Sequence, residues 1–324
     1  MNKLITTLYL FLLVAGYSCD SAKISEPEWQ NPLQQLKVYS ILEVGDYIWI
    51  GTDYGLVRFD KSNTDTTLYD TQNSGLPHNH AITLAADDSQ CIWIGAGNSA
   101  LVRFDGVHWS VFDMENSGIP SNTISDIAID TQGNMWIGTS DGVAFFDGEN
   151  FTNYNTDNSQ LPSNTVTSVA LTKSGKLWVG TWGNGVGVYH ASKWTVYNTT
   201  NTVMQSPYIF DIAVDKDDRI WIGEGGGLNL VSGTSWKNYN TLNSGLPNSD
   251  VTNLAFDRNG HVWLGTYEGG IADFDGKRWT VYDMANTLLP SNQITAILVD
   301  QQNNKWIGTR FGLFLFNEHG IRLQ

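Results

Sequence analysis

Short segments in which bulky apolar residues alternate with small or polar ones follow one another along almost the whole chain. Residues 124–130, ISDIAID, show the period of two that is expected of a half-buried β-strand. Polar turns then lead to MWIGT (135–139), GVAFF (142–146) and FTNY (151–154), and the connection that follows is rich in Asn, Ser and Pro. The segments between them lack the 3.6-residue period of an amphipathic helix. The pattern therefore predicts an all-β protein.

The same order of segments recurs at a fixed interval, which is marked by the sequence Trp-[Ile/Val/Leu]-Gly. Successive copies are 42 to 44 residues apart, and a constant period in this range is the signature of a repeat architecture. Four short strands in each of seven repeats predict a seven-bladed β-propeller with four antiparallel strands per blade. The seven tryptophans are Trp49, Trp93, Trp136, Trp178, Trp221, Trp263 and Trp306.

Each tryptophan falls on a strand that we expect to be buried on both faces, because neighbouring blades of a propeller pack face to face. Trp136 can fill the space between blades on one face while Ile137 fills the other. Gly138 suits a place where two backbones come close. A tryptophan buries roughly 150–250 Å², so seven equivalent copies would dominate the energy of the core. We predict that all seven are buried.

The end of the chain bears on how the ring of blades closes. Residues 316–324 align without a gap with residues 274–282 of the preceding repeat. We therefore predict that residues 321–323 form the outer strand of the last blade. The alternative is that residues 24–29 pair there, so that the N-terminus closes the ring.

The N-terminal residues have the form of a targeting segment. Lys3 precedes a mostly apolar run that is too short to span a membrane, and small residues lead from it to Cys19. We expect Cys19 to be lipidated, with plain secretion as the alternative, which places the protein in the cell envelope on the periplasmic side or the outer surface. The predicted organisation is a lipoprotein-type signal peptide (1–18), a tether (19–36) and the propeller (37–324).

Charge narrows the range of ligands. The chain has 33 acidic and 18 basic residues, a formal net charge of −15. Such a surface disfavours nucleic acid and anionic lipid headgroups, so we expect no nucleic acid partner and membrane attachment through the lipid anchor only. It also argues against an acidic ligand, unless basic groups are concentrated locally.

Comparison of the seven repeats with one another indicates where a binding site can lie. Positions that are alike in every blade serve the scaffold, whereas positions that differ are free to take other roles. The most variable are the turn after each Trp-x-Gly and the connection that precedes each first strand, and in a propeller both lie on one face around the axis. The candidate ligand-binding residues there are Asp53, Tyr54, His78, His80, Trp182, Asn184, Tyr208, Glu224, Tyr267, Glu268, Arg310 and Phe311.

These side chains are of two kinds. Aromatic rings surrounded by polar hydrogen-bonding groups suit a neutral, polyhydroxylated ligand such as an oligosaccharide. We expect the aromatic residues to be densest where blades six, seven and one meet. Arg310 would be the only cation of that arc, held by Asp53 or Glu268.

Motifs of catalysis are not evident. The sequence has no GxSxG, no HExxH and no Cys/His cluster, and its glycine-rich turns are not followed by a helix that could form a phosphate loop. His78 or His80 could join Glu224 or Glu268 across the axis at a metal, although no ligand spacing supports this. We therefore predict no catalytic residues, no metal and no cofactor, and we favour binding over enzymatic activity.

The repeat PSNTISDIAIDTQGNMWIGTSDGVAFFDGENFTNYNTDNS, residues 120–159, resembles the two-component regulator propeller repeat. The resemblance covers almost the whole mature chain. Repeats of this kind form the periplasmic sensor regions of hybrid histidine kinases in Bacteroidetes-type bacteria, which generally respond to glycans. Those sensors carry two propellers, an Ig-like domain, a membrane span and a kinase, whereas this sequence holds one propeller. The resemblance therefore implies ligand or partner binding rather than kinase activity.

Two further features qualify this resemblance. In the fifth repeat, NTVMQSPYIFD (201–211) replaces the usual connection, which makes Tyr208 a candidate for a local role. The sequence also resembles, more weakly, virginiamycin B lyase. That resemblance implies a catalytic histidine and a metal-binding acid in the central funnel, for which His78 or His80 with Glu224 or Glu268 are the candidates.

Together these observations favour a sensor-like binding propeller of the cell envelope. Its expected partner is an oligosaccharide or an envelope protein. A metal-assisted lyase or hydrolase and a purely structural interaction scaffold are the alternatives.

Overall fold

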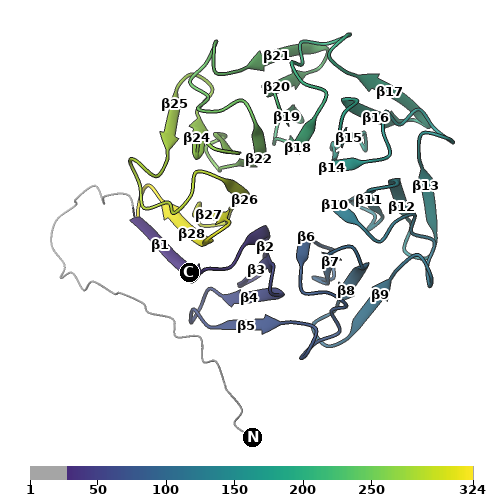
Figure 1. Ribbon diagram of the computed structural model, residues 1–324, viewed down its shortest axis with the longest axis horizontal. Helices are drawn as coiled ribbons and strands as arrows, with labels where there is room; N and C mark the ends of the chain where they lie inside the picture. The colour runs from purple at the N-terminus through teal and green to yellow at the C-terminus, as the bar shows by residue number, and fades with distance from the viewer. Residues whose placement is uncertain (1–27, 324) are drawn as a thin grey trace, which may run out of the picture.

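The computed structural model describes residues 28–323, which form seven four-stranded antiparallel sheets arranged around one axis (Figure 1). The prediction of an all-β, seven-bladed propeller is confirmed. In each blade the strands run outward from the axis in chain order, except in the seventh, which takes its outer strand from the N-terminus. The predicted signal peptide and Cys19 lie outside the described residues.

Each blade has an inner strand at the axis, then a second and a third strand, and an outer strand at the rim. The inner strands are β2 (Val38–Val44), β6 (Ala81–Ala86), β10 (Ile124–Ile129), β14 (Val166–Leu171), β18 (Ile209–Val214), β22 (Val251–Phe256) and β26 (Ile294–Val299). The second strands are β3 (Tyr47–Thr52), β7 (Ile92–Ala96), β11 (Met135–Thr139), β15 (Leu177–Thr181), β19 (Ile220–Glu224), β23 (Val262–Thr266) and β27 (Lys305–Thr309). The third strands are β4 (Leu56–Asp60), β8 (Ala100–Phe104), β12 (Gly142–Phe146), β16 (Val186–His190), β20 (Gly227–Ser232), β24 (Ile271–Phe274) and β28 (Gly312–Asn317). The outer strands are β5 (Thr66–Tyr69), β9 (Trp109–Phe112), β13 (Phe151–Tyr154), β17 (Lys193–Tyr197), β21 (Ser235–Tyr239), β25 (Trp279–Tyr282) and β1 (Glu28–Gln34).

The seven tryptophans are all buried, none more than 8% exposed, as predicted. Each lies in a cluster with the aliphatic residues that flank the tryptophan of the next blade. Trp93 of blade two, for example, packs with Met135 and Ile137 of blade three. Both faces of a second strand are therefore covered, one by each neighbouring blade, and the hydrophobic core consists of seven seams between blades.

The glycine after each tryptophan lets the next blade come close. A Cβ added to Gly51 would lie 2.2 Å from the carbonyl oxygen of Ala81, the first residue of the next inner strand. A Cβ added to Gly223 would lie 2.4 Å from the carbonyl oxygen of Val251. Only glycine fits between backbones at this distance.

The turns between the inner and second strands also support the tryptophans. The Asp300 Oδ1 atom accepts hydrogen bonds from the backbone N–H groups of Gln302 and Asn304, while Oδ2 accepts one from the Trp306 indole N–H at 2.8 Å. Asp87 and Asp215 do the same in blades two and five. The aspartates of these turns thus order the turn and satisfy a buried indole N–H.

The prediction for ring closure is wrong. Strand β1 pairs antiparallel with β28, with Glu28 opposite Asn317 and Gln34 opposite Gly312. The N-terminal segment, and not residues 321–323, is therefore the outer strand of the seventh blade. The propeller begins at or before residue 28, inside the segment 19–36 that was expected to be a tether. The first and last strands of the chain are hydrogen-bonded to each other.

The C-terminal residues take another place. After the turn at Gly320, Ile321 and Leu323 pack against the core seam of blades seven and one. The Arg322 backbone N–H donates to the Asn304 side-chain oxygen at 3.1 Å. The short tail is therefore fixed by one buried amide, because the edge of β28 is already occupied by the longer β1.

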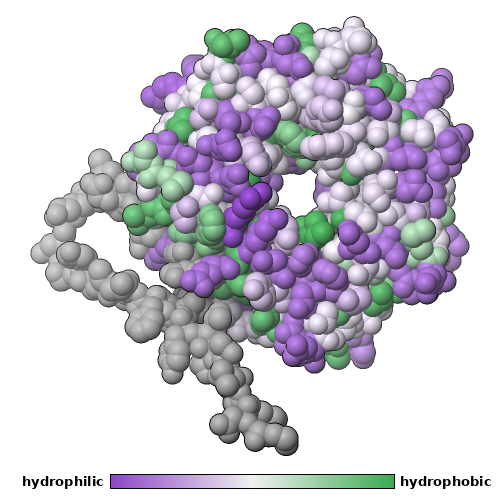
Figure 2. Space-filling view, in the orientation of Figure 1, coloured by the Kyte–Doolittle hydropathy of each residue, from purple (hydrophilic) through white to green (hydrophobic). Residues whose placement is uncertain are grey.

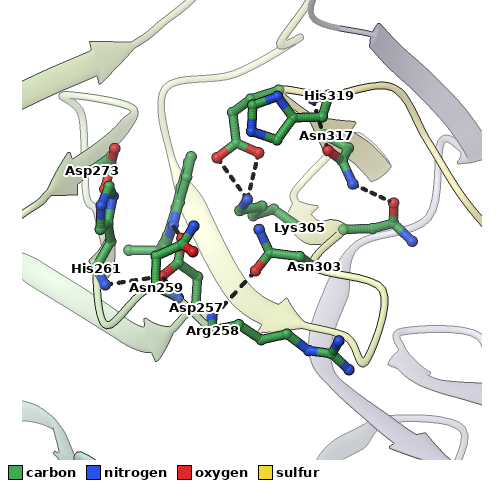
Figure 3. A network of polar contacts seen from close by, with 12 residues as sticks. Asp257, Arg258, Asn259, His261, Asp273, Asn303, Lys305, Asn317 and His319 are labelled. Atoms are coloured by element: carbon green, nitrogen blue, oxygen red, sulfur yellow. Dashed lines mark hydrogen bonds and ion pairs between the residues drawn. The ribbon is translucent and has the colours of Figure 1, made fainter.

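Polar side chains fill part of the seam between blades six and seven (Figure 3). Lys305 is fully buried at a position that is aliphatic in the other six blades, and its Nζ atom lies 2.7 Å from Glu318 Oε1 and 4.6 Å from the centre of the Trp263 ring. Beside it, the His261 Nδ1 and Asp273 Oδ1 atoms are 2.9 Å apart. This network lies at the end of the blades that carries the turns between inner and second strands.

The space-filling view shows an opening at the axis, with hydrophobic residues at intervals on its rim among hydrophilic ones (Figure 2). The seven inner strands surround this opening (Figure 1). Side chains of these strands and of the loops above them therefore share one central space.

Closure by β1 predicts that a core residue of this strand is essential for stability. Leu33 is 3% exposed and packs with Ile50 and Trp306. Leu33→Ala should lower the free energy of unfolding by about 2–5 kcal/mol, measured by denaturant unfolding. Val107→Ala, at a side chain that is 76% exposed, should change it by less than about 0.5 kcal/mol. A Leu33→Ala protein as stable as the wild type would contradict the closure.

The aspartate–indole bond predicts a stabilising substitution in blade four. Trp178 has a buried indole N–H without a partner among the described residues, and Thr172 stands where five of the other six blades have aspartate. Thr172→Asp should add about 1 kcal/mol of stability and raise the melting temperature. The reciprocal change, Asp300→Thr, should lower it. If both changes act in the same direction, the bond does not have this role.

Candidate functional site

The two variable loop sets meet on one face, because backbone hydrogen bonds join them in most blades. The first or second residue after a second strand donates its N–H to the carbonyl oxygen of the residue just before the inner strand. Examples are Trp182 to Thr165 at 2.9 Å and Tyr267 to Asp250 at 3.0 Å. We call the surface formed by these turns and connections the loop face.

A buried threonine holds the turn on the loop face in most blades. The Thr52 hydroxyl donates to the Gly55 carbonyl at 2.8 Å and accepts the Tyr54 N–H at 3.1 Å. Gly55 has φ 143°, and a Cβ there would lie 2.2 Å from the Tyr69 carbonyl oxygen. The residue at the tip of the turn therefore projects from a braced backbone rather than from a loose loop.

The loop face holds every exposed aromatic side chain in the described part of the chain. Every other tyrosine, tryptophan and phenylalanine whose exposure the structure describes is buried or half-buried. The exposed ones are Tyr54 (58%), Trp182 (52%), Tyr208 (44%), Tyr267 (45%) and Phe311 (58%). They are the five aromatic residues named as candidates from the sequence.

Their distribution differs in part from expectation. The closest ring contacts occur on blades four and five, where the centre of the Trp182 ring is 5.1 Å from that of Tyr208 and 5.8 Å from that of Phe210. Trp182 and Tyr208 also form a backbone bridge. The unusual connection of blade five thus completes an aromatic cluster. Three of the five exposed rings, Tyr54, Tyr267 and Phe311, lie on the arc of blades six, seven and one as predicted, but no ring contact joins them within residues 28–323.

That arc instead contains a cavity of about 260 Å³. Its lining combines rings, amides, hydroxyls and two cations. Arg310 had been predicted to be the only cation of this arc. That prediction is wrong, because Lys37 lines the same cavity. Asp53 accepts a hydrogen bond from the Lys37 backbone N–H at 3.0 Å, and among residues 28–323 Arg310 makes no ion pair with it or with Glu268. The lining residues are Lys37, Tyr39, Thr252, Asn253, Tyr267, Gln293, Ile294, Thr295 and Arg310.

Three further candidate residues on the loop face, His78, His80 and Asn184, make contacts within the loops. His78 Nδ1 accepts the His80 backbone N–H at 3.0 Å, and the two imidazole ring centres are 4.7 Å apart. Asn184 donates its side-chain amide to the Pro162 carbonyl oxygen at 3.0 Å. These bonds order the loops without using all the polar groups of the residues.

Glu224 is not on the surface, where it had been predicted to supply an acceptor. It is fully buried at the position of the bracing threonine, and its carboxylate accepts the backbone N–H groups of Gln205 at 2.7 Å and Ser206 at 3.4 Å. Burial raises the pKa of the Glu224 carboxyl. Its acceptor capacity orders the connection of blade five, and so it supports Tyr208 instead of a ligand.

The candidates for a metal site are not assembled. No group of three or more His, Cys, Asp or Glu side chains that could hold a metal ion is found within residues 28–323. The carboxylate of Glu224 faces the backbone of its own blade's connection. The described residues also include no helix of the length and apolarity needed to cross a membrane.

A polar network lies on the inner strands below the loop face. Ser168 Oγ is 3.0 Å from Asp126 Oδ2 and 3.3 Å from Asp211 Oδ1, and it accepts the Ile212 N–H at 3.1 Å. The Leu254 N–H donates to Asp211 Oδ2 at 2.7 Å. One serine hydroxyl thus links carboxyl groups from the blades on either side.

The charge of this network depends on how many protons the serine hydroxyl and the two carboxyl groups hold between them. A hydroxyl has one proton and can donate it to only one carboxylate. If Ser168 donates to Asp126, its contact with Asp211 is favourable only when Asp211 is protonated and donates. Both aspartates are half-buried, and each carboxyl group lies against the backbone of the next blade's inner strand, which encloses it. This enclosure, with the nearby charge of Asp126, raises the pKa of Asp211 to about 7.

Several residues of this region were missed from the sequence. Tyr39, Phe210 and the two aspartates lie in inner strands, outside the turns and connections that the comparison of repeats selected. Lys37 precedes the inner strand of blade one and was not named among the candidates there. All of them vary between blades, either just before the inner strand or within its first three residues. Extending the comparison of repeats by these few positions would have found them.

Comparison with known proteins identifies the repeats. Three segments match the family model described as two component regulator propeller, at residues 118–141, 160–183 and 245–268. Each segment spans the connection, the inner strand and the Trp-x-Gly strand of one blade. Three of the seven blades are therefore similar to the two component regulator propeller repeat. This confirms the resemblance recognised in the sequence.

Solved structures agree with this assignment. The extracellular domain of a hybrid two component system from B. thetaiotaomicron is 25% identical, with a TM-score of 0.79, and the match covers 90% of this chain and 41% of that one. A second such domain from the same organism is 23% identical, with a TM-score of 0.71 and coverage of 87% and 39%. The chain thus spans about two fifths of the length of these domains.

Two component regulator propeller repeats share their fold with enzymes as well. Virginiamycin B lyase from Staphylococcus aureus is 15% identical, with a TM-score of 0.72, and the match covers 90% of this chain and 99% of that one. At this identity the likeness shows the fold alone. Among curated proteins, none matches the chain.

The serine-linked carboxyl pair predicts a pH-dependent stability. Because the pKa of Asp211 is higher in the folded protein than the usual 3.8, its protonation favours the folded state, and this contribution is lost as pH rises from about 4 through 7. Asp211→Asn mimics the protonated form. Between pH 5 and pH 8 the stability of the wild type should fall relative to this variant by about 2–3 kcal/mol.

The measurement is denaturant unfolding of both proteins across this pH range. Asp130→Asn, in a turn on blade three, is the matched control and should not remove the pH dependence. A constant difference between wild type and Asp211→Asn at all pH values would contradict a raised pKa.

Proposed function

We propose that this protein is a sensor-like binding propeller of the cell envelope that recognises an oligosaccharide on its loop face. The observation that carries the proposal is that the five exposed aromatic side chains of the described residues all lie on that face, four on braced turns and Tyr208 on the connection of blade five. Sugar rings offer apolar C–H faces that pack on aromatic rings, and hydroxyl groups that bond to polar neighbours.

The polar groups beside the rings support the same ligand class. His78, Glu268 and Gln293 lie in the turns and connections of the loop face, between aromatic positions. Amide and imidazole groups can both donate to and accept from sugar hydroxyls, and a carboxylate accepts hydrogen bonds from them. A partner protein in a sensing or uptake system could then respond to the occupied face.

The proposed location rests on the relatives and on the N-terminal sequence. The matched structures are extracellular domains of two component systems. The N-terminal residues 1–18 have the form of a lipoprotein signal that ends before Cys19. Both support a protein held at the cell envelope by a lipid anchor.

The proposal predicts that aromatic residues of the loop face contribute to affinity but not to folding. A stacked ring contributes on the order of 1 kcal/mol beyond its buried area. Trp182→Ala or Tyr267→Ala should therefore weaken binding of a glycan found on a glycan array by roughly fivefold or more. The melting temperature should stay close to that of the wild type, because both side chains are about half exposed.

Calorimetric titration of each variant measures the effect, with Val107→Ala as the control at an exposed apolar residue away from the loop face. A collapse in melting temperature would show that these residues are part of the core. Unchanged affinity in both variants would place the glycan site elsewhere.

A further inference from the structure

The cavity between blades six, seven and one differs in charge from the rest of the molecule. The chain has almost two acidic residues for each basic one. The lining of this cavity nevertheless contains two cations, Lys37 and Arg310, and neither aspartate nor glutamate. Basic groups are thus concentrated locally within a protein of strongly negative net charge.

Neither cation is neutralised by a carboxylate within the described residues. The Lys37 ammonium lies 4.3 Å from the centre of the Tyr39 ring, a cation–π contact that holds it in place without removing its charge. Arg310 is exposed and has no ion pair. The Asp53 carboxylate accepts a hydrogen bond from the Lys37 backbone N–H at 3.0 Å and forms no ion pair with either cation within residues 28–323.

Some cations elsewhere on the propeller are paired with carboxylates, whereas these two line one cavity that has no carboxylate in its lining. Arg278 Nε is 3.1 Å from Asp275 Oδ2, and Arg219 Nε is 2.7 Å from Asp215 Oδ2. The absence of such a partner at the cavity leaves positive potential at the place where the ligand of the proposed function would enter.

The other groups in the cavity match a sugar ring. Tyr267, one of the five exposed aromatic residues, forms part of the wall, and Gln293 and Asn253 add amide groups. The Thr295 hydroxyl is buried and has no hydrogen-bond partner in the described residues. At about 260 Å³ the cavity is smaller than the pockets of drug-sized ligands, roughly 300–1,000 Å³. It therefore suits one terminal ring.

We propose that the glycan recognised on the loop face is acidic, and that Arg310 and Lys37 bind a carboxylate or sulfate group of its terminal ring while Tyr267 packs on the ring. This inference rests on the proposed function and specifies its ligand. A guanidinium binds a carboxylate or sulfate through paired hydrogen bonds, and the ammonium adds a second positive charge. The negative net charge of the chain then opposes acidic glycans everywhere except at this cavity.

The test compares charged and neutral forms of the same sugars by calorimetric titration. One pair is trigalacturonate and its fully methyl-esterified form, and the other is a sulfated galactan tetrasaccharide and its desulfated form. A charged probe should bind at least about tenfold more tightly than its neutral partner, and raised salt should weaken it. The pair that shows the difference identifies the group as carboxylate or sulfate.

Variants assign the effect to the cavity. Arg310→Gln and Lys37→Gln should each reduce affinity for the charged probe by about tenfold and leave the neutral form unaffected. Arg278→Gln is the matched control, because its side chain is 87% exposed on an outer turn. It should change neither affinity.

The outcomes separate this inference from the proposed function. Failure of both charged probes to bind, or equal affinity for charged and neutral forms, overturns the inference. A preference for the charged form that survives Arg310→Gln and Lys37→Gln overturns it as well. If a neutral glycan on an array binds and depends on Trp182, the proposed function stands without the requirement for charge. If only peptides bind, both fail.

Discussion

The propeller depends on one contact, the packing of each blade's tryptophan against the aliphatic residues of the next blade. A flat sheet would leave this large ring exposed, so a single repeat cannot be stable alone. The glycine that follows the tryptophan allows the neighbouring backbone to come within contact distance of the strand. The indole ring and the glycine therefore act together, one filling the seam and the other permitting it to be narrow.

A ring of such seams has to be closed, and the last seam is no different in chemistry from the others. Trp306 packs with Ile48 and Ile50 of blade one, as every tryptophan packs with the next blade. What differs is the hydrogen bonding, since the seventh sheet takes β1 as its outer strand. The two ends of the chain are thereby held together, and opening the ring requires breaking a sheet as well as a seam.

This scaffold leaves the loop face free to vary. Braced turns carry exposed rings on blades one, four, six and seven, while the altered connection of blade five adds Tyr208, supported by the buried Glu224. Two surroundings result around one axis, an aromatic cluster at Trp182 and a cationic cavity at Arg310. An extended ligand lying across the face can contact both, with its charge facing the cavity.

The sequence alone determined the fold, because the period of the Trp-x-Gly motif and the alternation within each repeat describe contacts that recur in every blade. It also identified the exposed aromatic residues, since they vary at a position where the scaffold does not. The tertiary structure decided the features that rest on a contact made once in the ring and not repeated in every blade. The pairing of β1 with β28, the burial of Glu224 and the shared cavity of Lys37 and Arg310 became visible only in the assembled ring. Such contacts depend on how the whole ring closes, and a pattern that is local in the chain cannot specify them.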